Sequence, residues 1–533
     1  MELHQNNNRL IKVILVFILL IYFLYNIPFI SRLSFSLESL KNIFQSQDGL
    51  QTPLLRSLTF AFIQAVLLTS LGLIFSLALF KIPIYSQSGK LLSLLLVPIL
   101  LGNVAIAFIF KIILFDANAL FQNENIKFLT LSFIQIWQFG SLFIYLFWLN
   151  QQTIPQSVWN YANAAHFNTY EKIKDVILPK QRNLSLLLFI LAFVFSYYED
   201  AKIQFIFRAS RGTNTELVNQ WLNRKFQSDS LINADFGFAN ISQSASIVII
   251  FAVIGLILTL ILKNKLFYSF IRSERTVNFK IPFSSLIGKI TTFCLVMLII
   301  IPIVFVIIIQ SGNFQFHFQS LIMPLWLTLF ASISASFISI LFGILSRLAW
   351  QRLLADFNRG SMTYLIAIFM LILIPPIVLL ITGFKWMQNI GYSTPNTIYL
   401  AWIIGHIFLS FPLLSGFAIA THFRVKNNII NYLQSHQLTL MERIRDLFIK
   451  PFKADYLLTF IIAFALIWNE STINSVLSDV IPSFVTILNR TISGKAADYA
   501  NGMNYLFISF VLAIISVGIW NYSIIRFQKL SEE

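Results

Sequence analysis

The chain has 533 residues, of which 57% are hydrophobic and only 11% are charged, and its formal net charge is +16 at pH 7. Such a composition, with many long apolar stretches, excludes a soluble globular protein and predicts one that lives in a lipid bilayer. The basic residues are divided among separate loops, which argues against nucleic-acid binding and predicts membrane topology with attraction to anionic lipid headgroups.

Hydropathy predicts twelve membrane spans in an all-α, polytopic protein. Lys and Arg gather in the loops that become cytoplasmic if the N-terminus is inside, so both termini are expected in the cytoplasm. Cys294 is the only cysteine and lies in a predicted span, which rules out a disulfide within the chain. The spans are predicted at roughly 13–30, 56–80, 91–114, 129–149, 183–199, 243–263, 288–310, 321–346, 363–385, 397–420, 455–472 and 503–525.

One charged passage occurs twice, at an offset of 271 residues. Glu171-Lys172-Ile173-Lys174-Asp175 returns as Glu442-Arg443-Ile444-Arg445-Asp446, and the same offset pairs Gln135 with His406 and Glu199 with Glu470. Six spans in each copy give both copies the same orientation in the membrane. The sequence therefore predicts two parallel six-helix repeats, residues 1–270 and 271–533.

The repeated passage falls in two long inner loops, at about 150–182 and 421–454. In the first loop, Ile173, Val176 and Ile177 share one face of a predicted helix, while charged residues occupy the other face. Such a helix could be a solvated connector, or it could lie against the membrane or a partner. Its recurrence at equivalent places in both halves favours a symmetric partner with two docking sites.

The passage from Ile154-Pro155 through Asn160-Tyr161-Ala162 to Leu178-Pro179 resembles the cytoplasmic "EAA" loop of permease subunits in binding-protein-dependent ABC importers. In that family the loop has Ile/Leu-Pro, a Glu-Ala-Ala triplet, a Gly and a closing Leu-Pro. Two such loops on one chain resemble the fused permeases of the ferric-ion and thiamine importer group. The sequence departs from the family pattern at three kinds of position: Asn160 and Asn431 replace Glu, His166 and Gln437 replace Gly, and Pro451 comes one position late.

The resemblance implies a MetI-like permease fold in which residues 160–176 and 431–447 form two coupling helices. No phosphate-binding loop of the Gly-x-x-x-x-Gly-Lys-Ser/Thr type occurs in the sequence, so ATP hydrolysis is expected on a separate homodimeric ATP-binding subunit in the cytoplasm. An extracytoplasmic solute-binding protein is the other implied partner. The residues expected at the ATPase interface are Asn160, Ala162, Ala165, His166, Glu171, Lys172, Asp175 and Pro179, with Asn431, Gln437, Glu442, Arg443, Asp446 and Pro451 in the second copy.

A second pair of equivalent features lies at the outer ends of the fifth and eleventh spans, where Glu199-Asp200 corresponds to Glu470-Ser471, preceded by Asn469. Acidic residues at membrane depth tend to face a cavity or a partner, although these could also reach the outer headgroups. We expect Glu199, Asp200, Asn469 and Glu470 along a translocation pathway for a cationic or metal-bearing solute. Prolines inside spans bend helices, so Pro98 and Pro375 are expected to shape that pathway or merely to kink the packing.

The sequence thus predicts a permease of an ATP-driven importer in the inner (plasma) membrane, with ferric ion as the first choice of solute and thiamine as the second. A secondary transporter of the major-facilitator type, driven by an ion gradient, is the alternative with the same number of spans. An enzyme is not predicted, since no clustered carboxylates or nucleophile–base pair occurs, and neither a resident metal site nor a cofactor is expected.

Overall fold

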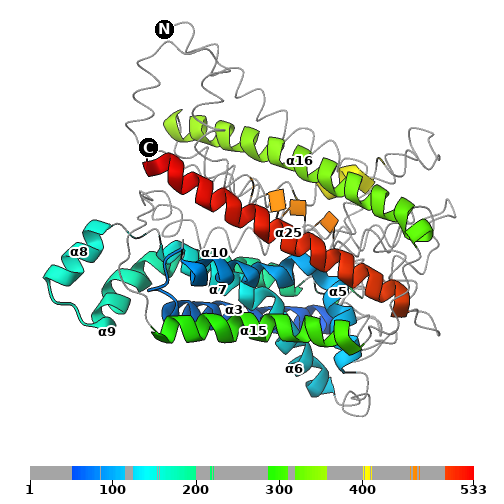
Figure 1. The fold of residues 1–533 in the computed structure, drawn as a ribbon, viewed down its shortest axis with the longest axis horizontal. Coiled ribbons are helices and arrows are strands. Elements are labelled where there is room, and N and C mark those ends of the chain that lie inside the picture. The colour runs from blue at the N-terminus through cyan, green and yellow to red at the C-terminus, as the bar shows by residue number, and fades with distance from the viewer. Residues whose placement is uncertain are drawn as a thin grey trace, which may run out of the picture. The chain divides into compact units, whose positions relative to one another are not determined.

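The computed structural model is helical throughout the part of the chain that it describes, with no strand there (Figure 1). The described residues are 51–84, 86–114, 124–152, 156–197, 286–309, 318–356 and 499–532, with short runs and single positions at 154, 199, 217–218, 220, 400, 402–407, 410, 457, 460–461, 463–464 and 467–468.

The helices follow one another along the chain with short connections in the first half. In order they are α3 (Gln51–Ala78), α4 (Gln87–Leu92), the 3-10 helix η1 (Ser93–Leu96), α5 (Val97–Ile113), α6 (Glu124–Gln135), the π-helix η4 (Ile136–Gly140), α7 (Ser141–Gln151), α8 (Gln156–Ala164), α9 (Thr169–Glu171), the π-helix η5 (Lys172–Ile177), α10 (Leu178–Tyr197), α15 (Leu286–Ile309), α16 (Phe318–Asp356) and α25 (Tyr499–Glu532).

Six helical stretches are long and apolar enough to cross a membrane, which confirms a multi-pass helical membrane protein. They are Gln51–Ala78, Gln87–Ile113, Asn125–Gln151, Leu286–Ile309, Ile322–Leu341 and Gly502–Tyr522, and each coincides with a predicted span. The predicted span at 183–199 falls largely on α10, which begins five residues earlier. The other predicted spans lie wholly or partly outside the described residues.

The chain forms two compact units, and each unit draws on both halves of the sequence. Unit 1 comprises Met1–Gln51, Trp221–Glu274 and Ile322–Thr486, whereas unit 2 comprises Thr52–Gln220, Arg275–Leu321 and Ile487–Glu533. Predicted spans two to five of the first half therefore belong to one unit with predicted spans seven and twelve. The proposed repeat boundary at residue 270 concerns sequence repetition and stays a prediction.

Within unit 2, the span Gln87–Ile113 is the most enclosed of the six, because other spans of the unit pack around α5. Helix α25 approaches it so closely that a Cβ atom at Gly502 would lie 2.4 Å from Cε2 of Phe108. The indole Nε1 of Trp520 on α25 also donates a hydrogen bond of 2.7 Å to the hydroxyl of Tyr145 on α7. These contacts join the last helix of the chain to its first described spans.

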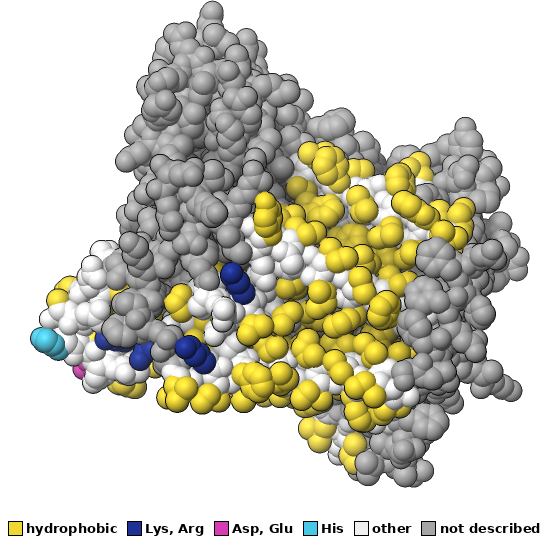
Figure 2. All heavy atoms as spheres, in the orientation of Figure 1, with side chains coloured by type: hydrophobic (Ala, Val, Ile, Leu, Met, Phe, Trp, Pro, Cys, Tyr) yellow, Lys and Arg dark blue, Asp and Glu magenta, His cyan; other side chains and the backbone are white. Residues whose placement is uncertain are grey.

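The outward faces of unit 2 are apolar, as expected for surfaces in contact with lipid. Figure 2 shows hydrophobic side chains spread over the visible face along α15, whereas basic side chains lie toward the end that carries α8 and α9. Large exposed apolar residues on α3 and α15 include Phe62, Ile63, Val66, Ile74, Ile290, Phe293, Ile301 and Phe305.

Two neighbouring spans of unit 2 depart from regular α-helix near their middles. Pro98 lies in the first turn of α5, where a backbone N–H would have no acceptor within the helix, so the proline costs no hydrogen bond. The 3-10 helix η1 comes just before α5. Four residues later, Gly102 has φ 79° and ψ 171°. This backbone conformation, which glycine adopts readily, interrupts the regular helix of α5. The span 125–151 widens in turn into the π-helix η4. Both irregular segments are buried in protein, which is where lipid-spanning chains tolerate them.

Candidate functional site

Residues 156–177, which we call the arm, stand away from the bundle of unit 2 (Figure 1). The first arm helix, α8, ends in a Schellman motif centred on His166. The backbone N–H of Phe167 donates to the carbonyl of Ala162 at 2.9 Å, and that of His166 donates to the carbonyl of Asn163 at 3.1 Å. The Phe167 ring packs edge-on against Tyr161, the apolar contact that usually completes this motif.

His166 takes the left-handed conformation that this motif needs, with φ 54°. It is the one non-glycine residue with a positive φ in the described part of the chain. The loops that this passage resembles usually have glycine at this position. The turn forms here with histidine, and the His166 side chain is exposed.

The second arm helix starts at once from a capping box. Asn168 Oδ1 accepts a hydrogen bond of 2.9 Å from the backbone N–H of Glu171, and Glu171 Oε2 accepts one of 2.8 Å from the N–H of Asn168. Two N–H groups that helix starts leave unpaired are thereby satisfied. The helix then widens into η5 before Pro179, which has no N–H to donate to the carbonyl of Asp175. Motif and cap together make the arm a rigid helix–turn–helix.

The arm is rooted in the bundle by its apolar face, as its sequence predicted. Ile177 is fully buried in a cluster with Ile154 and Trp159, against which Ile173 and Val176 pack, while Lys174 and Asp175 are exposed. The Trp159 indole stacks on Phe80 beyond the end of α3, with 6.2 Å between ring centroids and 19° between planes. The root of the arm therefore contacts the chain directly after α3.

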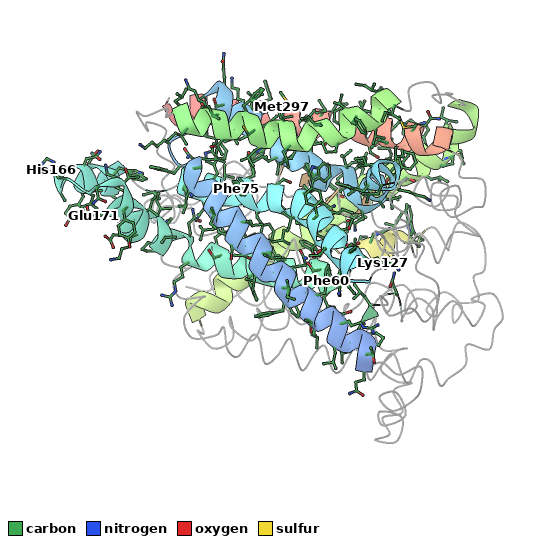
Figure 3. The ribbon with its side chains drawn as sticks, turned by 90° about the horizontal axis from the view of Figure 1, so that it is seen from below. Phe60, Phe75, Lys127, His166, Glu171 and Met297 are labelled. Carbon is green, nitrogen blue, oxygen red and sulfur yellow. The ribbon has the colours of Figure 1, made fainter. Side chains whose placement is uncertain are left out.

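The arm carries an exposed aromatic surface at its tip. Tyr161 is 68% exposed and Tyr170 is 69% exposed, although both belong to ordered helices. Figure 3 labels His166 and Glu171 at this tip, at the left of the view and well away from Phe60 and Lys127. Exposed tyrosines on a rigid support are typical of protein-binding surfaces.

Buried amides fasten the two helices that flank the arm. Asn150 Nδ2, at the end of α7, donates 2.8 Å to Gln181 Oε1 near the start of α10, and Gln181 Nε2 donates 2.9 Å to the carbonyl of Phe147. Gln151 Nε2 also donates 3.1 Å to the Ser76 hydroxyl on α3. We call the Asn150–Gln181 contact the arm-side tie. This tie links the residue stretch just before the arm to the stretch just after it, so the two ends of the arm are held together.

A second set of polar contacts, which we call the Glu199 tie, joins the same two helical segments farther from the arm. We call these segments, residues 124–151 and 178–197, the rods. Gln135 Nε2 donates 2.9 Å to Glu199 Oε2, and the Ser196 hydroxyl donates 2.9 Å to Gln135 Oε1. All three side chains are buried, and Glu199 is only 3% exposed. A carboxylate so enclosed at membrane depth requires hydrogen-bond partners. The Gln135 amide is one of them, and the Ser196 hydroxyl holds that amide in turn.

The two ties are in register along an antiparallel helix pair. Fifteen residues separate Gln135 from Asn150 on one rod, and fifteen separate Gln181 from Ser196 on the other. At 1.5 Å per residue the ties lie about 22 Å apart. The rods thus form a braced element with the arm at one end and Glu199 near the other.

The irregular helices contribute a further polar pair beside the Glu199 tie. Gln138 Nε2, in η4, donates 3.1 Å to Asn103 Oδ1, directly after the break at Gly102. Gln138 is 1% exposed, and its Oε1 has no hydrogen-bond partner among the described residues. Gln135 and Gln138 are three residues apart, so they are neighbours along one helix face.

The structure places eight of the predicted coupling residues on the arm or its root and two predicted pathway residues elsewhere. Ala162 is buried, Glu171 and Lys172 are half-buried, and Asn160, Ala165, His166, Asp175 and Pro179 are exposed. Pro98 is buried in α5 and Glu199 in its tie. The other predicted site residues lie outside the described residues: Asp200, Pro375, Asn431, Gln437, Glu442, Arg443, Asp446, Pro451, Asn469 and Glu470.

Several residues of both ties were not singled out from the sequence. Gln135 was noted only as the repeat counterpart of His406, and Asn103, Gln138, Asn150 and Gln181 were not noted at all. The equal fifteen-residue spacing of polar residues on successive antiparallel spans was the available signal. His406 itself is fully buried in unit 1, its ring 5.1 Å from that of Trp402, and neither ring nitrogen has a hydrogen-bond partner within the described residues.

Comparisons with known proteins do not assign this chain to a family: no protein-family model, no curated protein and no solved structure matches it. In the described part of the chain, no group of three or more His, Cys, Asp or Glu side chains could hold a metal ion. The arm, the two ties and the broken helix therefore carry the functional argument.

Proposed function

We propose that this chain is the permease of an ATP-driven importer, with twelve spans arranged as two six-helix repeats. In this proposal the arm and its counterpart at 431–447 are coupling helices that dock on a homodimeric ATP-binding subunit in the cytoplasm. Both chain termini are then cytoplasmic, and an extracytoplasmic binding protein delivers the solute. The protein would lie in the inner membrane.

The arm is the observation that carries this proposal. It is ordered by a Schellman motif and a capping box, it projects from an apolar bundle, and it exposes Tyr161 and Tyr170. A loop that served only to connect two spans would need neither a rigid turn nor exposed aromatic rings. A rigid projection is suited to a partner that moves, since the motion of the partner can pass through the arm to the bundle without deforming the arm.

The ties support a route by which such a push could reach the solute pathway. The arm-side tie and the Trp159–Phe80 stack attach the arm to α3, α7 and α10, and the rods extend about 22 Å to Glu199. ATP-driven closure of the partner would shift these rods together, as rigid-body alternating access requires. Ferric ion and thiamine are the solutes proposed, in that order, by family resemblance.

Native mass spectrometry of the tagged chain, purified in mild detergent from its own host, tests the proposal. One copy of this chain with two copies of a nucleotide-binding subunit is the expected result. A chain that is reproducibly alone, yet moves solute in liposomes under an ion gradient, would overturn it and establish a secondary transporter. A matched sample carrying Tyr161→Ala and Tyr170→Ala should lose the partner while keeping its yield in the membrane.

A further inference from the structure

We propose that α15 contains a hinge at Pro302 and that the Trp137 indole is the latch that holds this hinge closed. The rod 124–151, on which Trp137 lies, then determines whether the last turns of α15 are held in place or free to swing. The inference goes beyond the proposed function and does not depend on it. It concerns two packed helices of unit 2 and assumes neither an ATPase nor a solute.

The first argument is the position of the proline. Pro302 lies inside α15, whereas Pro98 lies in the first turn of α5, where it costs no hydrogen bond. A proline inside a helix has no N–H to donate to the carbonyl four residues earlier, and its ring crowds that carbonyl. In α15 this carbonyl belongs to Leu298. The helix is therefore weakened at this point, and prolines are a common cause of bends in helices.

The second argument is the donor that replaces the missing one. Trp137 Nε1 donates a hydrogen bond of 3.1 Å to the carbonyl of Leu298, the same carbonyl that Pro302 leaves without its helical donor. Within a membrane, a backbone carbonyl freed by proline is costly unless a neighbouring helix provides a donor. The bond therefore stabilises α15 in the observed conformation, and it lasts only while the two spans keep their relative position.

The third argument is the way the indole is held. Trp137 belongs to the π-helix η4 and is 3% exposed. Its ring packs edge-on against Phe110 of α5, with 5.5 Å between the ring centroids and 80° between the planes. The position of the indole N–H is thus fixed by its own rod and by α5, and not by α15. Short π-helical segments of this kind are frequent at functional sites.

The rest of the interface allows α15 to move. Its exposed face, which includes Met297 in Figure 3, is suited to lipid. Apolar contacts have no preferred direction, whereas a hydrogen bond weakens steeply when its angle departs from linear. A small shift of the rod therefore breaks the latch while the apolar packing persists, and residues 303–309 then swing about Pro302. The buried face of α15 is apolar on both sides of the proline, with Val296, Ile299, Ile303 and Val306.

Distance measurements between two spin labels test the latch on the purified full chain in lipid nanodiscs. Cys294, the only cysteine, is exposed on α15 before Pro302, and Ile308→Cys adds a second exposed position after it. Double electron–electron resonance should give one main distance, near the roughly 21 Å that these 14 residues span in a helix. Trp137→Phe keeps an aromatic ring but removes the donor. It should shift the equilibrium toward the open hinge roughly five- to a hundredfold, seen as a second distance.

Two further variants distinguish a latch from an ordinary packing contact. Trp148→Phe, on the same rod, removes a buried hydrogen bond of the same 3.1 Å length, to the carbonyl of Ile82, and should leave the distance on α15 unchanged. Pro302→Ala supplies the missing N–H to the Leu298 carbonyl, so it should suppress the second distance in the Trp137→Phe chain.

The latch would be overturned if Trp137→Phe kept the single distance of the parent chain, if Trp148→Phe gave the second distance as well, or if Pro302→Ala failed to suppress it. Should Trp137→Phe alone not insert, its yield in the membrane becomes the readout. Adding Pro302→Ala should then restore that yield, and a yield that stays lost would count against the latch. None of these measurements uses a partner or a solute, so a chain without an ATPase would overturn the proposed function and leave the latch in place.

Discussion

The arm-side tie and the Glu199 tie brace the same pair of rods, but their chemistry differs. At the arm-side tie all the groups are neutral: Asn150, Gln181 and the Phe147 carbonyl are linked by hydrogen bonds of 2.8 and 2.9 Å. At the other tie, the Gln135 amide donates to the carboxyl of Glu199 and accepts from the Ser196 hydroxyl. Neutral amides fix geometry at a modest desolvation cost, whereas a buried carboxylate costs far more and remains only where its charge has a use.

This difference separates an end that attaches the arm from an end that holds a buried carboxyl group. The amide contact lies where the arm joins the bundle, so its task is to keep α7 and α10 together under load. The carboxylate is bound by Gln135, three residues before Gln138, whose amide contacts Asn103 next to the break at Gly102. Changes at one end should therefore alter stability and coupling, whereas changes at the other should alter transport alone.

The largest effect is expected from charge reversal on the arm and at its predicted counterpart in 431–447. Glu171→Lys removes the reciprocal cap on Asn168 and places a cation at a helix N-terminus, which opposes the helix dipole. Combined with Glu442→Lys, it should abolish solute uptake while membrane insertion is unchanged. Uptake in vesicles and the yield of inserted protein are the measurements. Glu171→Gln with Glu442→Gln is the control, since glutamine can keep the capping bond; normal uptake by the lysine pair would remove the case for the arms.

The next effect concerns the Glu199 tie alone. Glu199→Gln retains an acceptor for Gln135 Nε2, so the tie persists while the charge is lost. Uptake should fall at least about tenfold, the equivalent of 1.4 kcal/mol at the barrier, with melting temperature and ATPase binding unchanged. Ser196→Ala is the matched control, because it deletes a hydrogen bond to Gln135 but keeps the carboxylate. Equal uptake by both variants would mean that Glu199 only fixes the helices.

A smaller and opposite pattern is expected at the arm-side tie. Gln181→Leu deprives Asn150 Nδ2 of its 2.8 Å acceptor and leaves the longer contact with the Lys180 carbonyl at 3.3 Å. Loss of this buried bond should destabilise unit 2 by about 1–3 kcal/mol and raise the ATP consumed per solute moved. Thermal unfolding and the ratio of hydrolysis to uptake measure the two effects. Arg182→Leu, at an exposed neighbouring position, should change neither quantity. If Gln181→Leu also left both unchanged, the hydrogen bond of the arm-side tie would contribute nothing to stability or coupling.

The sequence predicted the features that depend on local pattern. Apolar length located six spans, and helical periodicity placed Ile173, Val176 and Ile177 on the buried side of the arm. It did not predict the break at Gly102 or the π-helix at 136–140, because both depend on what neighbouring spans offer to freed backbone groups. Nor did it predict two units that each combine segments from both halves, since repetition in sequence does not determine which helices pack together.

The smallest effect should come from substitutions at His166. A residue with a Cβ atom costs about 1 kcal/mol in the left-handed region, and His166 sits there with φ 54°. His166→Gly should therefore stabilise the arm by up to about 1 kcal/mol, seen as slower hydrogen exchange in α8 and α9 with uptake unchanged. His166→Ala keeps the Cβ atom and should give no gain, while His166→Val should loosen the turn. If the glycine variant instead weakened coupling, the backbone shape of the turn would not be what matters at this position. The partner would then contact the imidazole of His166 at the tip of the arm.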